Sequence, residues 1–292
     1  MRILFIGSVL FSKSILDEII KSKNEVIGVI GRKESKFNSD FHDLVKYSKK
    51  KKIKSIYTND INSLKILKWV KKRKPDIIFC IGWSQLLKKK ILKTASLGVI
   101  GYHPSDLPKN RGRHPIIWSI ALGLKKVGSC FFFMKSRADA GNAISKKLIK
   151  IKKNYDSNLV YKKLIKVGRK QIREILLKIR TKKLKSFPQK NSASNYWRRR
   201  SELDGRIDWR MDAENINNLI KALAKPYPGA YFLFKEKKIR VWKSRVVESN
   251  KKNYEPGKIT RLKKNWVIKC GNKALQLITF SPKINLKGAT YL

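Results

Sequence analysis

Residues 3–8 read ILFIGS, and this short apolar run, ended by a Gly-Ser pair, indicates the fold class. Four consecutive apolar residues predict a strand buried on both faces, and the Gly-Ser pair predicts a tight turn at its carboxyl end. Residues 12–22 then place apolar side chains at helical spacing, and residues 25–30 form a second apolar run. A buried strand, a helix and another buried strand predict a parallel sheet with helices on both faces.

The same alternation continues along the chain. Helices are expected over residues 41–50 and 64–72, and strands over residues 53–57, 76–81 and 98–102. Ligands of open parallel sheets bind beyond the carboxyl ends of the strands. The chemistry is therefore expected where these strands end.

Further strands over residues 127–134 and 148–151 are expected at the edge of the sheet. A long amphipathic helix follows over residues 157–179. Its expected apolar stripe consists of Leu159, Leu164, Ile165, Ile172, Leu176 and Leu177. Residues 187–197 contain Pro, Ser and Asn without a clear period, which indicates a linker.

Beyond the linker, the pattern predicts a helix over residues 213–224 and several short strands. Those strands are expected over residues 231–234, 239–242, 266–270 and 275–279. The predicted fold is a Rossmann-like parallel α/β sheet with helices on both faces, followed by a small, mostly β, OB-like C-terminal domain. The expected division is a catalytic domain over residues 1–190, a linker over 191–203 and a small domain over 204–292.

The composition is that of a globular protein with a large excess of positive charge. The chain has 292 residues, 42% of them apolar and 10% aromatic, and a formal net charge of +50. Such a charge attracts polyanions at low salt. However, 17 of the 70 basic residues are Arg and 53 are Lys, spread along the whole chain. This distribution favours a compositional bias over a dedicated nucleic-acid surface.

Cysteine usage and hydropathy predict a cytoplasmic protein. Cys80, Cys130 and Cys270 lie far apart without metal-ligand spacing, so no metal site is expected. Cys80 and Cys130 fall inside apolar runs, where buried thiols in a reducing compartment are expected. We find no run of 18 apolar residues, and the chain leads straight into a strand. Neither a membrane span nor a secretory leader is expected.

The densest segment is residues 101–115, which read GYHPSDLPKNRGRHP. His103 directly follows a predicted buried strand, so its ring is held at the mouth of the sheet, as a general acid or electrostatic catalyst requires. Asp139 lies in the sequence RADAG, where the glycine permits a turn that aims the carboxylate back toward the sheet. Taken singly, His103 is equally well a capping or core residue, and Asp139 an Asx-turn residue.

Together these segments resemble the folate-dependent formyltransferase family, which includes methionyl-tRNA, glycinamide ribonucleotide and sugar-nucleotide formyltransferases. Residues 103–112, HPSDLPKNRG, and residues 138–141, ADAG, resemble its two catalytic-loop motifs. The likeness continues through residues 205–209, GRIDW, and residues 225–230, KPYPGA. These resemble the second domain of the methionyl-tRNA enzymes and of the formyltransferase part of the bifunctional aminoarabinose-pathway enzyme.

The resemblance implies 10-formyltetrahydrofolate as the formyl donor and no metal. It implies that His103 donates a proton or stabilises the oxyanion of a tetrahedral intermediate, and that Asp139 helps to take up the proton of the amine. The carrier is expected to contact Gln85, Leu86, Leu87, Arg113, Lys135, Ser136, Arg137 and Ala138. The acceptor is expected to contact Ser8, Val9, Phe11, Arg111 and Gly112.

One position departs from the family pattern, which has Asn two residues before the histidine, where this chain has Gly101. Loss of one oxyanion donor typically lowers the rate by about a hundred- to a thousandfold. Either another donor compensates, with Asn110, Asn142 or a main-chain N–H as candidates, or this branch is slow or inactive. We expect Gly101→Asn to be tolerated or to raise activity.

Three functions follow from the resemblance. In the first, the acceptor is a nucleotide-linked amino sugar destined for a surface polysaccharide such as lipopolysaccharide. The segment from residue 31 to 57, shorter than in the methionyl-tRNA enzymes, favours it, and this branch implies a homodimer. In the second, the acceptor is methionyl-tRNA, which the charge favours. In the third, the chain is a non-catalytic binder of folate or a sugar nucleotide, which Gly101 motivates.

Overall fold

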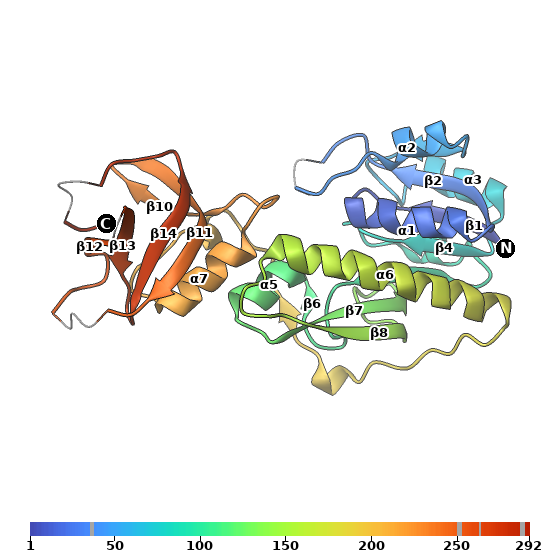
Figure 1. Ribbon diagram of the computed structural model, residues 1–292. Helices are drawn as coiled ribbons and strands as arrows, with labels where there is room; N and C mark the ends of the chain where they lie inside the picture. Colours follow the sequence, from blue (N-terminus) through green and yellow to red (C-terminus); the bar gives the residue numbers. More distant parts are fainter. Residues whose placement is uncertain (36–37, 250–252, 263, 287–289) are drawn as a thin grey trace. The chain divides into compact units, whose positions relative to one another are not determined.

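Figure 1 shows the computed structural model of the protein, which describes residues 1–35, 38–249, 253–262, 264–286 and 290–292. The chain divides into two compact units. The first consists of Met1–Gly112, Val127–Ile149 and Lys162–Trp197, and the second of Arg113–Lys126, Lys150–Tyr161 and Arg198–Leu292. The second unit therefore contains two segments that precede residue 190. The domain limits expected from the sequence stay a prediction.

The first unit is built on a sheet with the strand order β3-β2-β1-β4-β5-β7-β8. Its strands are β1 (Arg2–Ile6), β2 (Glu25–Gly31), β3 (Ser55–Tyr57), β4 (Ile77–Cys80), β5 (Val99–His103), β7 (Lys126–Phe133) and β8 (Ala143–Lys150). Its helices are α1 (Leu10–Lys21), α2 (Leu44–Lys50), α3 (Leu64–Arg73), α4 (Lys89–Leu92) and, from Lys162 on, α6 (Ser157–Arg180). The strands from β3 to β5 pair in parallel, as predicted.

Helices cover both faces of this sheet. On one face, Leu4 of β1 and Ile78 of β4 belong to an apolar cluster that also contains Val70 of α3. On the opposite face, Tyr102 of β5 stacks on Phe11 of α1, with ring centroids 4.2 Å apart. Successive side chains of a strand alternate between faces, so an unbroken apolar run serves both layers. The Rossmann-like class predicted from the sequence is confirmed.

Strand β7 runs antiparallel to β5, with His103 opposite Cys130 and Ile100 opposite Phe133. A parallel neighbour would require a crossover connection that carries the chain back to the start of β5. The chain instead re-enters the sheet beside the carboxyl end of β5. The sheet is therefore mixed. The apolar pattern predicted strands in this part of the sheet, but not the antiparallel direction of β7.

The stripe predicted for α6 is partly wrong. Leu164, Ile172 and Leu176 are buried as expected, whereas Leu159 is 37% and Leu177 51% exposed. The buried face also includes Val160, Gly168, Gln171 and Ile175. Gly168 lies against the Phe11 ring, and Gln171 donates to the main-chain oxygen of Ser129 at 3.0 Å. Because a glycine and a glutamine occupy part of the buried face, the positions of apolar residues alone do not show which side of α6 is buried.

The second unit contains α5 (Pro115–Ala121), α7 (Ala213–Ala222) and an antiparallel sheet with the order β10-β11-β14-β13-β12. Its strands are β10 (Ala230–Phe234), β11 (Lys237–Val247), β12 (Ile259–Leu262), β13 (Asn265–Lys269) and β14 (Ala274–Ser281). This confirms a C-terminal β unit. The sequence did not predict β12, half of whose side chains are exposed. The OB-like closure stays a prediction.

The burial of the cysteines and the hydropathy of the helices bear on two predictions from the sequence. Cys80 and Cys130 are buried, as predicted, and so is Cys270; burial raises the pKa of each thiol. In the described part of the chain, no helix has both the length and the hydropathy needed to cross a bilayer.

Candidate active site

His103 is the last residue of β5, and only 7% of it is exposed. Its Nδ1 atom lies 3.6 Å from Oδ1 of Asp139, and its Nε2 atom lies 3.3 Å from the carbonyl oxygen of Asn110. Both ring nitrogens therefore face oxygen acceptors. An imidazolium donates from both nitrogens, and either neutral tautomer from one. The two residues that the motifs singled out, 36 positions apart, are thus brought together.

Asp139 lies in the loop between β7 and β8, with a left-handed backbone (φ 52°) that Asp adopts more readily than most residues. Its Oδ2 atom accepts the main-chain N–H of Gly112 at 3.2 Å. The loop closes over Gly141, where an added Cβ would lie 1.5 Å from the carbonyl oxygen of Phe133. This close approach requires glycine and turns the carboxylate back toward His103.

Gly101 is a regular strand residue between Cys80 and Phe132, and its φ is not positive. A Cβ atom at this position would lie 2.8 Å from Cγ of Met134 and 3.1 Å from Cζ of Phe132. Met134 therefore fills the space next to the position where the family has Asn. The absence of a side chain at Gly101 leaves the room that Met134 occupies. A larger side chain at position 101 therefore requires Met134 to move.

Arg111 lies in the short strand β6 (Arg111–Gly112) and is fully buried. Its guanidinium donates to three neutral acceptors, Gln189 Oε1 at 2.7 Å, Tyr196 Oη at 3.1 Å and Asn191 Oδ1 at 3.4 Å. Its Nε atom has no partner among the described residues. Arg111, which was predicted to contact the acceptor, is therefore buried inside the first unit, where its guanidinium is hydrogen-bonded to side chains of residues 189–196.

Three further residues predicted to contact the acceptor follow β1. Ser8 is buried, and its hydroxyl donates to the carbonyl oxygen of Gly82 at 3.2 Å, which joins the carboxyl ends of β1 and β4. Val9 is also buried, 8% exposed, and precedes α1. Phe11 is 4% exposed and belongs to the core beneath α6. Of these, Ser8 and Val9 lie where a ligand of the sheet is expected.

Residues 85–87 follow β4 and have divided roles. Gln85 accepts the N–H of Ile61 at 3.2 Å and donates to the carbonyl oxygen of Asn59 at 2.9 Å, which fixes the neighbouring loop. Leu87 is 2% exposed and belongs to the core, whereas Leu86 is 54% exposed. Of these two leucines, only Leu86 exposes an apolar side chain at the surface.

The remaining predicted carrier contacts lie at the surface. Lys135, Ser136 and Arg137 are exposed and precede Asp139 in the β7–β8 loop, and Ala138 is half-buried. Arg113 is also exposed and belongs to the second unit.

Two polar features were missed from the sequence. Gln189, inside the expected linker, donates to the carbonyl oxygens of Asp139 and Gly141 at 2.9 and 2.6 Å. Arg32 directly follows β2, with its guanidinium 4.9 Å from the centre of the Trp83 ring. Arg32 could have been predicted, because it lies at the carboxyl end of a strand, where ligands of parallel sheets bind. No local signal marks Gln189.

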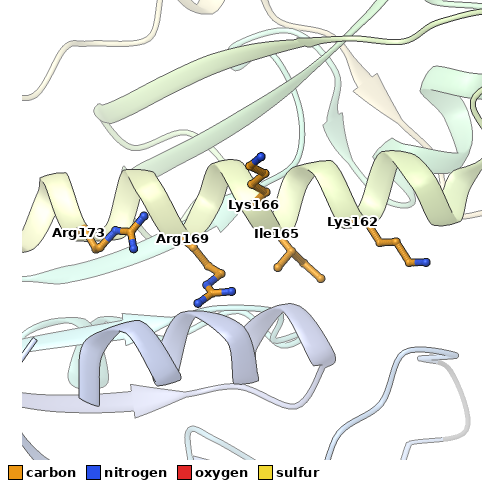
Figure 2. Close-up of a pocket in the computed structure, with 5 residues that line it drawn as sticks. All are labelled: Lys162, Ile165, Lys166, Arg169 and Arg173. Carbon is orange, nitrogen blue, oxygen red and sulfur yellow. The ribbon is translucent and has the colours of Figure 1, made fainter. Parts of the chain in front are cut away.

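A second, strongly basic region lies on α6. A hollow of about 490 Å³ is lined by Lys162, Ile165, Lys166, Arg169 and Arg173. Figure 2 shows these five side chains along α6. The buried Glu18 of α1 accepts from Arg169 and Arg173. Two of the four cations therefore attach α6 to α1, so this hollow is weak support for a polyanion site. Within the described residues, no group of His, Cys, Asp or Glu is arranged to hold a metal ion.

Most of the chain matches models of one known protein family. Residues 1–176 match the family described as formyl transferase, and residues 200–291 match the formyl transferase C-terminal domain. The chain is 30% identical over 283 residues to methionyl-tRNA formyltransferase of Caldanaerobacter subterraneus subsp. tengcongensis, covering 95% of this chain and 91% of the relative. It is 36% identical over 239 residues to the bifunctional polymyxin resistance protein ArnA of Wigglesworthia glossinidia brevipalpis. That match covers 82% of this chain and 36% of ArnA.

Solved structures share the fold across nearly the whole chain. The N-formyltransferase of Helicobacter canadensis, in complex with folinic acid and dTDP-3-aminofucose, superposes with a TM-score of 0.73 at 18% identity, covering 94% of this chain and 98% of that one. WlaRD, a sugar 3N-formyl transferase, has a TM-score of 0.72 at 19% identity, covering 97% and 99%.

Proposed function

The chain belongs to the formyltransferase family, and from this premise we propose that it transfers a formyl group from 10-formyltetrahydrofolate to the primary amine of a nucleotide-linked amino sugar. Membership confirms the family that the motifs predicted, and with it the enzyme class, a folate-dependent formyltransferase. The amino-sugar acceptor is the part that is proposed.

The observation that carries the chemistry is the distance of 3.6 Å between Nδ1 of His103, at the end of β5, and Oδ1 of Asp139. In the proposed reaction the amine attacks the formyl carbon and forms a tetrahedral intermediate. Collapse of this intermediate breaks the bond between the formyl carbon and N10 of the carrier, N10 takes a proton, and tetrahydrofolate leaves. The His103 ring supplies a proton or a positive charge to the developing oxyanion. Asp139 keeps the charged ring in place and receives the proton of the amine, directly or through water.

The donor would lie against the surface of the first unit that includes Leu86 and the exposed residues before Asp139. Leu86 offers apolar contact for a flat ring system, and main-chain groups of the β7–β8 loop offer hydrogen bonds to its edge. The acceptor would lie near Ser8 and Val9, at the carboxyl end of β1.

Two observations support an amino sugar as acceptor. The solved structures that share the fold include a sugar 3N-formyl transferase and an N-formyltransferase in complex with dTDP-3-aminofucose. The basic hollow on α6 includes two arginines held by Glu18, which weakens the case for a tRNA surface built from this helix. Methionyl-tRNA stays the second candidate, favoured by the charge of +50 and by relatives that span the full chain.

The test is the release of tetrahydrofolate from 10-formyltetrahydrofolate with a panel of acceptors. The panel contains nucleotide-linked amino sugars, methionyl-tRNA and uncharged tRNA as its control. We expect turnover with an amino sugar and none with methionyl-tRNA. Turnover with methionyl-tRNA alone would replace the proposal by the second candidate. Folate binding without turnover of any acceptor would favour a non-catalytic binder.

A further inference from the structure

Residues 187–197, which we call the strap, run along the first unit after α6 and end in β9 (Tyr196–Trp197). They bury little apolar surface: Phe187 is 61% and Tyr196 48% exposed, and the short helix η1 (Asn191–Ala193) has no buried residue. A cavity of about 440 Å³ lies beside the strap, between it and the start of β8. Hydrogen bonds, rather than apolar packing, therefore hold this segment on the unit.

Gln189 joins the strap to the loop that carries Asp139. Its side-chain nitrogen donates to the carbonyl oxygens of Asp139 at 2.9 Å and Gly141 at 2.6 Å. Its side-chain oxygen accepts from Nη2 of Arg111 at 2.7 Å. Both hydrogens and the oxygen of this amide are thus used, and the two donated bonds hold the left-handed backbone at Asp139.

Asn195 makes the corresponding connection to the loop after His103. Its side-chain oxygen accepts the N–H of Asn110 at 2.8 Å, its side-chain nitrogen donates to Oδ1 of Asn110 at 3.1 Å, and its carbonyl oxygen accepts the N–H of Arg111 at 3.0 Å. The carbonyl oxygen of Asn110 is the group that faces Nε2 of His103. The strap is therefore hydrogen-bonded to the main chain at Asp139 and to Asn110, the residue whose carbonyl oxygen faces His103.

Arg111 lies between these connections. Its buried guanidinium donates to Gln189, Asn191 and Tyr196 of the strap, and β6 pairs in parallel with β9. The next residue, Gly112, donates its N–H to the Asp139 carboxylate. A displacement of the strap is therefore transmitted to Asp139 by two routes, through Gln189 and through Gly112.

We propose that Gln189 is a positioning residue that fixes the Asp139 carboxylate beside His103. The expected effect of Gln189 on the rate rests on the proposed function, whereas its effect on the position of Asp139 does not. A catalytic group displaced by about 1 Å can lower a rate by about a hundredfold. Gln189 touches no reacting atom and acts through the loop of residues 139–141.

The decisive variant is Gln189→Glu. It keeps an oxygen acceptor for Arg111 and adds an ion pair, but it removes both N–H donors and places a carboxylate oxygen against two carbonyl oxygens. Asn191→Asp is the matched control, because it adds the same charge beside the same guanidinium without contacting residues 139–141. We expect Gln189→Glu to lower kcat by about 10- to 100-fold, with KM for both substrates changed less than about threefold. Asn191→Asp should keep kcat within about twofold.

Thermal unfolding of both variants separates positioning from folding. A kcat loss in Gln189→Glu with an unchanged or raised Tm supports positioning. Equal losses in Gln189→Glu and Asn191→Asp, or wild-type kcat in Gln189→Glu, would overturn it. Gln189→Met, of the same length and without polar groups, should also lower kcat and tests the inference if the Glu variant fails to fold.

A second measurement needs no acceptor. Amide hydrogen exchange at Gly112 reports its bond to Asp139, so exchange should be faster in Gln189→Glu and Gln189→Met and unchanged in Asn191→Asp. Unchanged exchange in both Gln189 variants would overturn the inference. If the wild-type protein formylates no acceptor, the proposed function fails, and this measurement still decides the role of Gln189.

Discussion

His103 and His114 lie on one continuous stretch of chain, yet their surroundings are opposite in character. His103 faces acceptors, the carboxylate of Asp139 and the carbonyl oxygen of Asn110. The Nδ1 atom of His114 instead accepts the main-chain N–H of Arg200 at 3.3 Å. Oxygen acceptors therefore surround the first ring, whereas the second ring accepts an N–H and is suited to remain uncharged.

The charges around His114 strengthen this contrast. Burial lowers the pKa of His114, and Arg113, Arg199 and Arg200 lower it further, against an opposing contribution from Asp204. A histidine in a basic surrounding is a poor proton donor at neutral pH. Residue type alone therefore does not distinguish the two histidines of this segment, whereas the sign of the groups around each ring favours His103 as the candidate catalytic residue.

Replacing each histidine by Asn tests the contrast most directly. Asn fits both sites, because it accepts and donates hydrogen bonds and adopts the left-handed backbone of His114 (φ 55°). General acid–base groups typically contribute about 10²–10⁴ in rate. We expect His103→Asn to lower kcat by about a thousandfold with an unchanged Tm, and His114→Asn to keep kcat within about threefold. Near-wild-type turnover in His103→Asn would remove His103 from the mechanism.

The carboxylate beside His103 is tested by Asp139→Asn, which keeps the size and backbone preference and removes the charge. We expect kcat to fall by about a hundredfold, because the amide cannot take up a proton or stabilise the charged ring. Asp106→Asn is the matched control in the same unit, where Asp106 pairs with Lys146 at 2.7 Å. Equal activity of the two variants would show that Asp139 is a turn residue without a catalytic role.

Gly101 tests how the site differs from the family pattern. The structure modifies the expectation that Asn is tolerated there, because a Cβ atom would lie 2.8 Å from Cγ of Met134. Overpacking of this kind typically costs about 1–3 kcal/mol. We expect Gly101→Asn alone to lower the free energy of unfolding by that amount, and Met134→Ala to relieve part of the loss in the double variant. A double-mutant cycle by urea denaturation measures this coupling, and strictly additive effects would contradict the requirement that Met134 move.

The parts of the fold that the sequence predicted are those decided by neighbouring residues. Residues 3–6 belong to β1 because a run that is apolar on both faces can be buried on both faces only in the middle of a covered sheet. The phase of α6 was harder to predict, since its buried face includes Gly168 and Gln171. The direction of β7 depends on the connection before it and not on its own residues.

The same distinction applies to the site. The motifs predicted His103 and Asp139 as candidates, and the structure brings them within 3.6 Å of each other. The strap could not be predicted, because Gln189 reaches Asp139 across 50 positions and Asn195 reaches Asn110 across 85. Single amide side chains in a polar segment carry no period, and only the fold shows what they contact. Arg111, expected at the acceptor, is buried because that segment supplies its partners.

The smallest expected effect concerns the pH dependence of stability. A histidine whose folded-state pKa lies below its usual value of 6.5 favours the uncharged ring in the folded chain. Its contribution to stability is therefore complete above about pH 6.5 and is lost as the pH falls through the folded-state value. We expect the wild-type protein to lose stability relative to His114→Asn on going from pH 8 to pH 5.5, measured by urea denaturation. His42, whose pKa is also lowered, chiefly by burial, is present in both proteins, so its contribution cancels. A difference that stays constant over this range, or grows in the opposite direction, would show that the ring of His114 is not kept uncharged and would remove the contrast with His103.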